Sequence, residues 1–533
     1  MGNFNLYLNS PCTTSADFTA FLSSLNLTLH INSPSHNRGL TLDLDIRLPA
    51  VYTSTRANLL SAVLASNIGL LGIALISVGA IRRIPVGQNE VHLFLTIMML
   101  LALCWILFYV SYIARHKHII IYRDTNAGPV WLRGGLLLFA GGSLLLHLFK
   151  IGYFIGSTGC QHPITIIFFV TQIAFLLAQT YFLWVHCKTC VQLQQDISRC
   201  GLSLLLTSNL MLWVSAVTDE FLHQTDSNDL PESKFLTIEG NSTECHCNSS
   251  ICHHLQLGSD YLYPFNIEYN LFASTMVYVM WKNVGRFLDQ FAQNKGNFYL
   301  HGFPIGLVLG LVGILVGLVI FIICEVKMTF NEWKIPALIM YYIFNIVLLS
   351  LMSMVSLLGS FIYILDKRSI DQRINPTRNL EVNLLLGTEM GQFSVAYFSI
   401  VALVSIRPHE PLAILSLMFS LITIIQHALQ SIFIIKGLYR QPHLPAVGPG
   451  HVQGNQLTWK RRFLKEITSF LLLSNIIVWI ILAFGPRSQF TSGTVKEFYG
   501  FHLWVSILNF GLPLGIFYRM HSVVSLFHVY QKA

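Results

Sequence analysis

Residues 201–213 read GLSLLLTSNLMLW, and residues 467–479 read ITSFLLLSNIIVW. In each stretch the pair Ser–Asn interrupts an apolar run, and a tryptophan follows the asparagine four positions later. A polar side chain inside such a run is costly unless it faces a partner or water. The repeated pattern therefore predicts two long apolar helices of one kind, each with a polar site at the same place along it.

The rest of the chain is also apolar. Of its 533 residues, 53% are hydrophobic and only 11% are charged. Apolar runs of about 20 residues recur throughout, as in transmembrane helices. This composition indicates an all-α polytopic membrane protein and excludes a soluble enzyme of this size. We expect twelve transmembrane helices, at residues 58–80, 91–114, 130–156, 163–187, 201–223, 262–285, 304–326, 336–365, 384–406, 412–438, 467–485 and 499–525.

The two halves of the chain resemble each other in the same direction along the sequence. Residues 179–182 (QTYF) match residues 430–433 (QSIF), and residues 278–280 (YVM) match residues 518–520 (YRM). Two sets of six helices that start on the same side predict two parallel six-helix domains, related by an axis along the membrane normal. The expected parts are a cytosolic N-terminal tail (1–57), an N-terminal domain (58–285), a cytosolic linker (286–303) and a C-terminal domain (304–533).

Basic residues indicate the orientation in the membrane. The loops that follow even-numbered helices hold roughly twice the Lys and Arg of the other loops, which predicts that both termini are cytosolic. The loop 224–260 then lies outside; it is acidic and carries glycosylation sequons at Asn241 and Asn248. A sequon at Asn26 in the predicted tail points the other way. We expect a multi-pass plasma-membrane glycoprotein, and its net charge of +8 requires no nucleic acid partner.

Three neutral polar residues interrupt the apolar helices of each half. They are Gln179, Asn209 and Tyr278 in the first half and Gln430, Asn475 and Tyr518 in the second. Counted from the predicted helix ends, both triads lie roughly 12 Å from the cytosolic edge. Such a layer can exclude hydrated ions and still pass a proton along hydrogen bonds. The alternative is interhelical bonding alone, worth under about 1 kcal/mol per contact. Duplication at a matched depth favours two constrictions.

Ionisable residues lie above and below these triads. Glu220 follows Asn209 by about three helical turns, so both share one helix face near the predicted outer mouth. Glu268 begins a polar face of the sixth helix, and His521 ends a motif near the predicted inner exit, where imidazole titrates close to neutral pH. These three residues are candidates for proton sensing or relay. For Glu220 and His521 the alternative is an ordinary solvated or interfacial helix end.

The predicted outer loop also gathers cysteines and histidines. Cys245, Cys247 and Cys252 stand beside His246, His253 and His254. In an oxidising compartment such a cluster more often forms disulfides than a metal site, and a zinc site at the three histidines remains the alternative. We expect no resident metal or organic cofactor.

Several motifs resemble those of the otopetrin family. They are WLRGG (131–135), KIGYF (150–154), YLYPFNIEY (261–269), ASTM (273–276), WKNVGR (281–286), NPTR (375–378) and IFYRMH (516–521). The resemblance implies a proton-selective channel that conducts H⁺ into the cell in response to extracellular acid. It also implies a homodimer, inhibition by external zinc, and bound sterol such as cholesterol among the membrane lipids. The constrictions of the family fall on the two triads, its outer acidic position on Glu220, and its terminal histidine on His521.

Two other classes of protein were weighed against a channel. A proton-coupled secondary transporter would also have twelve helices in two halves, but it should show broken helices at matched positions, and only Pro513 suggests a break. A membrane-embedded hydrolase or acyltransferase would need a nucleophile with a base. The sequence has no G-x-S-x-G, H-E-x-x-H or P-loop motif. A channel, and not an enzyme, is therefore expected.

Overall fold

The computed structural model describes residues 48–79, 88–115, 120–123, 130–158, 163–191, 194–228, 246–247, 250–285, 305–328, 333–366, 376–406, 410–441, 459–485 and 493–532. Twelve long helices lie within these ranges: α2 (Leu48–Gly79), α3 (Gln88–Phe108), α4 (Val130–Gly156), α5 (Pro163–His186), α6 (Gln195–Asn228), α7 (Ser250–Asn283), α8 (Ile305–Met328), α9 (Lys334–Leu365), α10 (Pro376–Ile406), α11 (Pro411–Leu438), α12 (Trp459–Phe484) and α15 (Phe501–Lys532). A π-helical turn η1 (Tyr109–Ile113) extends α3, and a short helix α14 (Gly493–Tyr499) precedes α15.

These helices confirm the predicted all-α membrane fold, because each expected apolar stretch coincides with one long helix. Eleven of them are long and apolar enough to cross a membrane. The twelfth, α7, is 34 residues long but carries buried polar side chains, and it also contains Pro264. From the sequence, only Pro513 was expected to break a helix. Large apolar side chains such as Leu315 (64% exposed) cover the outer surfaces of the helices, as expected for contact with lipid.

The predicted start of the first helix is wrong. α2 begins at Leu48, inside the segment 1–57 that was expected to be a tail. Pro49 occupies the first turn, where proline fits a helix well. No further proline and no glycine follows before Gly69, so nothing in the sequence stops the helix between these two residues.

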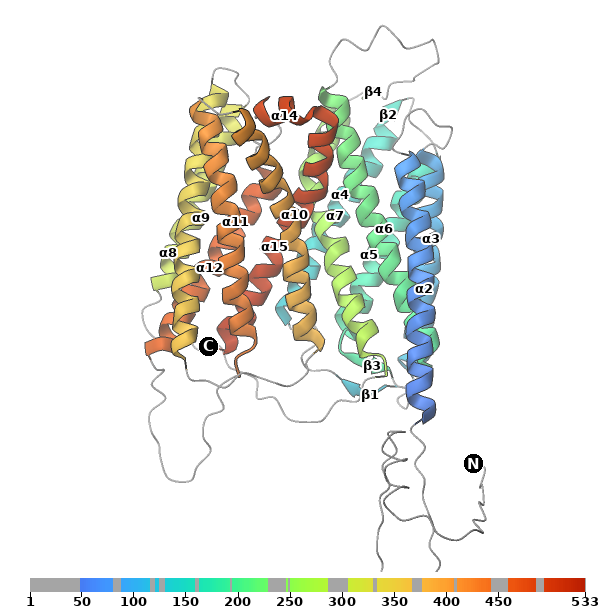
Figure 1. Cartoon of the computed structure of the whole chain (residues 1–533). Coiled ribbons are helices and arrows are strands. Elements are labelled where there is room, and N and C mark those ends of the chain that lie inside the picture. The colour runs from blue at the N-terminus through green and yellow to red at the C-terminus, as the bar shows by residue number, and fades with distance from the viewer. Residues whose placement is uncertain are drawn as a thin grey trace, which may run out of the picture.

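The helices pack in two groups of six that meet along the middle of the molecule (Figure 1). α2–α7 surround one core, and α8–α12 with α15 surround another. Aromatic rings join the two groups. The ring of Trp479 on α12 lies 5.9 Å from that of Phe139 on α4, and the ring of Phe517 on α15 lies 5.8 Å from that of Phe272 on α7. The seam between the groups is therefore a packed apolar contact.

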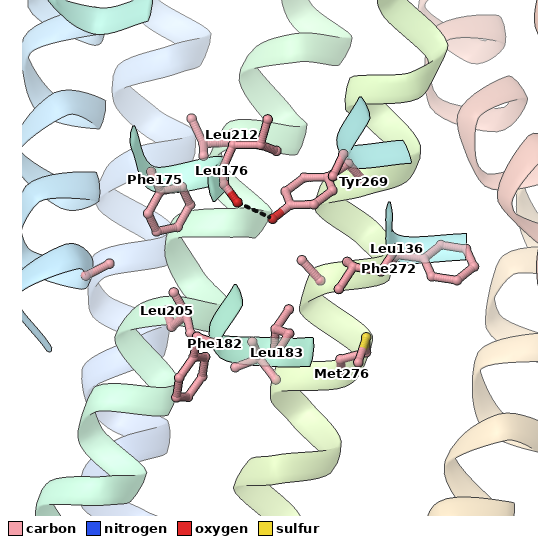
Figure 2. Close-up of a cluster of buried hydrophobic side chains, with 14 of the residues drawn as sticks. Leu136, Phe175, Leu176, Phe182, Leu183, Leu205, Leu212, Tyr269, Phe272 and Met276 are labelled. Atoms are coloured by element: carbon pink, nitrogen blue, oxygen red, sulfur yellow. Dashed lines mark hydrogen bonds between the residues drawn. The ribbon is translucent and has the colours of Figure 1, made fainter. Parts of the chain in front are cut away.

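The core of the first group is centred on α5. Figure 2 shows Phe175, Leu176, Phe182 and Leu183 of α5 among side chains from α4, α6 and α7. The hydroxyl of Tyr269 enters this core and donates to the backbone oxygen of Leu176 at 3.3 Å. The core thus holds α5, and the polar residues that follow Leu176 along it, against α6 and α7.

Short strands lie at the two ends of the first group. β1 (Ile120–Arg123) pairs antiparallel with β3 (Thr189–Val191), and β2 (Ser157–Thr158) pairs antiparallel with β4 (His246–Cys247) at the opposite end (Figure 1). The start of α2 and the end of α15 lie at the same end as β1 and β3. This is the expected result for an even number of antiparallel crossings.

Gly201 sets the distance between α3 and α6. A Cβ atom at this position would overlap the indole ring of Trp105, whereas a Cβ at Gly141 on α4 would have no heavy atom within 4 Å. We expect Gly201→Ala to destabilise the protein by about 1–3 kcal/mol, because a packed core does not accept an added methyl group without movement. Thermal unfolding in detergent would measure it, with Gly141→Ala as the matched control. Equal melting temperatures for the two variants would contradict this prediction.

Candidate functional site

A reciprocal amide pair joins α5 to α6. Nε2 of Gln179 donates to Oδ1 of Asn209 at 2.8 Å, and Nδ2 of Asn209 donates back to Oε1 of Gln179 at 3.3 Å. Nδ2 of Asn209 also donates to the backbone oxygen of Leu205 at 2.8 Å. Both side chains are fully buried (0% exposed). The structure thus brings together two of the three polar residues predicted in the first half.

Tyr278, the third member of the predicted triad, lies elsewhere. Its ring is half-buried and stacks on Trp281 at 5.8 Å, and the Lys282 ammonium lies 5.7 Å from its centre. No hydrogen bond joins Tyr278 to Gln179 or Asn209 among the described residues. Tyr269 supplies the nearby phenol instead: its hydroxyl lies 2.9 Å from Oγ1 of Thr180. The sequence does offer one signal for Tyr269: it follows Pro264 by five residues, as Tyr518 follows Pro513.

The hydroxyl of Tyr269 is expected to matter more than that of Tyr278. Tyr269→Phe removes hydrogen bonds to Thr180 and to the backbone of Leu176 inside the core. We expect it to cost about 1 kcal/mol of folding free energy, the usual net value of a buried hydrogen bond. Tyr278→Phe is the matched control and should cost less, because no hydrogen bond of the Tyr278 hydroxyl lies within the described residues. Denaturation of the two purified variants in parallel would measure the difference, and a larger loss for Tyr278→Phe would refute it.

In the second half the structure brings all three predicted residues together. Nε2 of Gln430 donates to Oδ1 of Asn475 at 3.2 Å and to the hydroxyl of Tyr518 at 3.4 Å. Nδ2 of Asn475 donates to Oε1 of Gln430 at 3.0 Å. These side chains belong to α11, α12 and α15, and all three are fully buried. The second amide pair therefore repeats the first, with a tyrosine added.

Two further residues, Gln426 and Arg519, extend this second cluster. Nε2 of Gln426 donates to Oε1 of Gln430 at 2.8 Å. Nη1 of Arg519 donates to Oε1 of Gln426 at 2.8 Å and to Oδ1 of Asn475 at 3.3 Å. Arg519 is 2% exposed, so a guanidinium group lies inside the apolar interior. In the sequence, its position directly after Tyr518 was the one indication that Arg519 lies near the second amide pair.

A carboxyl group closes the cluster on its α10 side. The hydroxyl of Ser431 donates to Oε2 of Glu389 at 2.9 Å and lies 3.1 Å from the hydroxyl of Tyr518. The imidazole of His427 stacks on the Tyr518 ring at 4.3 Å, and neither of its nitrogens has a hydrogen-bond partner among the residues that the structure describes. One continuous chain of hydrogen-bonding groups thus runs from Arg519 to Glu389.

The candidate relay residues lie apart from both amide pairs. Glu268 on α7 is fully buried, and neither of its carboxyl oxygens has a hydrogen-bond partner within the described part of the chain. Glu220 is half-buried near the far end of α6. Nε2 of His521 donates to the backbone oxygen of Glu381 at 3.0 Å, and its ring stacks on Phe517. His521 thus bonds to α10, and no hydrogen bond joins it to Tyr518 among the described residues.

The chain is similar to known proteins along most of its length. The family model described as Otopetrin matches residues 131–236 and 223–520, which is more than half of the chain. The chain belongs to the otopetrin family. It is 41% identical to "Proton channel OTOP2" of Mus musculus, over 89% of this chain and 94% of that protein. It is 39% identical to "Proton channel OTOP3" of Homo sapiens (89% and 85% covered) and 32% identical to "Proton channel OTOP1" of Rattus norvegicus (89% and 91% covered).

A second polar chain lies at the β2–β4 end of this otopetrin. Nζ of Lys150 on α4 donates to the hydroxyl of Tyr263 on α7 at 3.3 Å, and that hydroxyl donates to Oδ2 of Asp219 on α6, also at 3.3 Å. The chain ties three helices of the first group together beside Glu220. Lys150 was expected near a carboxylate at the outer side, but no spacing in the sequence could show that this carboxylate is Asp219.

The predicted outer loop lies largely outside the described residues. Asn241 and Asn248 are among the residues not described, and of His246 only the backbone in β4 is described. His253 and His254 are exposed at the start of α7, with ring centres 6.5 Å apart. Cys252 beside them is disulfide-bonded. Within the described part of the chain, no three His, Cys, Asp or Glu side chains form a possible metal site.

Proposed function

We propose that this otopetrin is a proton channel whose constrictions are the two buried amide pairs, Gln179–Asn209 and Gln430–Asn475. The observation that carries the proposal is the duplication of one reciprocal arrangement on corresponding helices of the two halves. Neutral amides leave no charge to hold a metal cation, and a layer of them without space for hydrated ions can pass a proton through exchangeable hydrogen bonds. The named proton channels OTOP1, OTOP2 and OTOP3 are its relatives.

The channel is a better account than a coupled transporter. Alternating access in transporters of two repeats commonly uses broken helices at corresponding positions. Pro264 and Pro513 lie inside α7 and α15, each five residues before Tyr269 or Tyr518. Both helices continue past their proline, so neither helix is broken there. The helices that hold Gln179, Asn209, Gln430 and Asn475 contain no internal proline.

We further propose that extracellular acid activates inward proton flow at the plasma membrane, with both termini in the cytosol. Glu220 stands beside the Lys150–Tyr263–Asp219 chain, where a carboxyl group can collect protons from the outer solution. Glu268 lies buried further along α7, and its carboxyl oxygens are available to accept a proton. His521, on the α10 side of the second group, is a proposed proton-sensing group.

The proposal is tested by recording whole-cell current and cytosolic pH together during external acid steps. We expect cytosolic acidification and a current that reverses at the proton equilibrium potential when sodium, potassium and chloride are exchanged. Reversal that follows another ion would refute proton selectivity. A pH change without net current would instead favour electroneutral coupled transport. Cells expressing no channel, and variants matched for surface amount, are the controls.

Other properties of the molecule are proposed from the resemblance and from surface features. The proposed assembly is a homodimer with sterol against its lipid-facing helices, and the proposed glycans are on Asn241 and Asn248. External zinc is proposed to inhibit at His253 and His254, which are exposed next to each other, together with His246. The zinc proposal predicts that His253→Ala/His254→Ala weakens inhibition of the current by zinc. Unchanged inhibition in that variant would move the zinc site elsewhere.

A further inference from the structure

The two proposed constrictions differ in charge. The first contains only neutral amides, and the second contains the buried guanidinium of Arg519, bonded to Gln426 and Asn475. Tyr269 takes the place of Tyr518 in the first half, so the residue that corresponds to Arg519 is Asn270, which is neutral. Likewise, the residue that corresponds to Gln426 is Phe175, four positions before Gln179. The first half therefore lacks both the cation and the side chain that positions it.

Among the described residues, no carboxylate makes direct contact with this cation, and Glu389 acts on it only from a distance. Arg519 and Glu389 form no ion pair, although both are described, and Gln426, Gln430, Tyr518 and Ser431 connect them. Nε of Arg519 has no hydrogen-bond partner in the described ranges. Because arginine does not lose its proton in proteins, the positive charge at the second amide pair is permanent.

The two amide pairs also differ in their free acceptor sites. An amide oxygen has two lone pairs. Oε1 of Gln430 accepts from Gln426 and Asn475, and Oδ1 of Asn475 accepts from Gln430 and Arg519, so both oxygens are saturated. In the first pair each oxygen accepts one hydrogen bond from the other residue, among the described groups. Only the first pair keeps an acceptor site for an incoming proton or water.

We infer that Arg519 is a selectivity-determining residue that bars protons from the second constriction, so that the Gln179–Asn209 constriction carries the proton current. A fixed positive charge repels an arriving proton strongly where water is absent, and arginines in narrow pores exclude protons and cations in this way. This inference rests on the proposed proton channel function and assigns its route. The second constriction then does not conduct protons, and the hydrogen-bonded chain from Arg519 to Glu389 holds its side chains in place.

The test removes the charge while the first passage is blocked. Asn209→Leu should lower the proton current about ten-fold, because an apolar side chain replaces half of the amide pair. In that background Arg519→Gln, which keeps an amide donor for Gln426 and Asn475, should raise the current about five-fold, since the electrostatic barrier is gone. Arg519→Lys in the same background keeps the charge and should give no rise.

Each outcome of this experiment decides between routes. No rise with Arg519→Gln, at a surface amount equal to that of Arg519→Lys, overturns the inference. If Arg519→Gln fails to reach the surface, the comparison of single variants decides: Asn209→Leu should lower the current far more than Asn475→Leu, and the reverse order overturns the inference. Absence of proton current in the unaltered protein would instead refute the proposed function itself, which keeps the two failures distinct.

Discussion

Replacing Gln179 by leucine is expected to reduce the proton current about ten-fold, because the substitution removes the only polar side chain of α5 that bonds to Asn209. Leucine has nearly the same size as glutamine, so the core should keep its shape. The lost function is the hydrogen-bonding path. Whole-cell current normalised to surface protein measures the effect.

A swap of the two amides provides the rescue for this prediction. Gln179→Asn/Asn209→Gln keeps one long and one short amide across the same helix pair, so it should recover a large part of the current. Leu177→Ala is the matched control, because Leu177 is 54% exposed on the lipid side of the same helix. Normal current in Gln179→Leu, or an equal loss of current in Leu177→Ala, would show that the amide pair only joins the two helices and does not conduct protons.

The second large effect concerns stability and falls on Gln426. Gln426→Leu removes the acceptor of the 2.8 Å hydrogen bond from Arg519 and the donor to Gln430, all within the buried interior. It leaves a guanidinium group with one partner fewer, and we expect a loss of about 3 kcal/mol, the range for breaking a buried charged network on one side. Thermal unfolding of the purified variant should show a melting temperature lowered by several degrees.

A double variant separates this charge effect from simple loss of packing. Arg519→Leu/Gln426→Leu removes the cation together with its acceptor, so it should be less destabilised than the sum of the two single variants. Ile425→Leu, at a neighbouring position that is 50% exposed, is the control for the helix itself. Strict additivity of the two single effects would contradict the claim that Gln426 stabilises the buried charge.

The sequence predicted the helices well because apolar length is a local property. The twelve stretches and the repeated Ser–Asn motif could be read directly, and so could the amides that pair in each half. Tyr278 could not, because depth along a helix does not say which way a side chain points. Near Tyr278, Nε1 of Trp281 donates to the hydroxyl of Ser61 on α2 at 3.2 Å, so this face of α7 lies against α2. The tyrosine that contacts α5 next to Gln179 is Tyr269.

The remaining parts of the site depend on contacts between distant segments. Arg519 was read as part of a motif, and its burial became clear only from its bonds to Gln426 and Asn475 on two other helices. His521 was expected near the inner exit as a candidate for proton sensing or relay. It bonds to the backbone of Glu381, whose side chain forms an ion pair with His528 at 2.8 Å. No spacing rule within one helix predicts partners on another.

The polar character of α7 has a consequence for how the chain is made. Asn266, Glu268 and Asn270 are buried against other helices of the molecule and not against lipid. A single charged residue at the centre of a helix raises the cost of insertion from the translocon by about 2.5–3.5 kcal/mol. α7 is therefore expected to leave the translocon together with α4 and α6, which cover its polar side chains. Membrane insertion of the first half would then finish only after α7 has been synthesised.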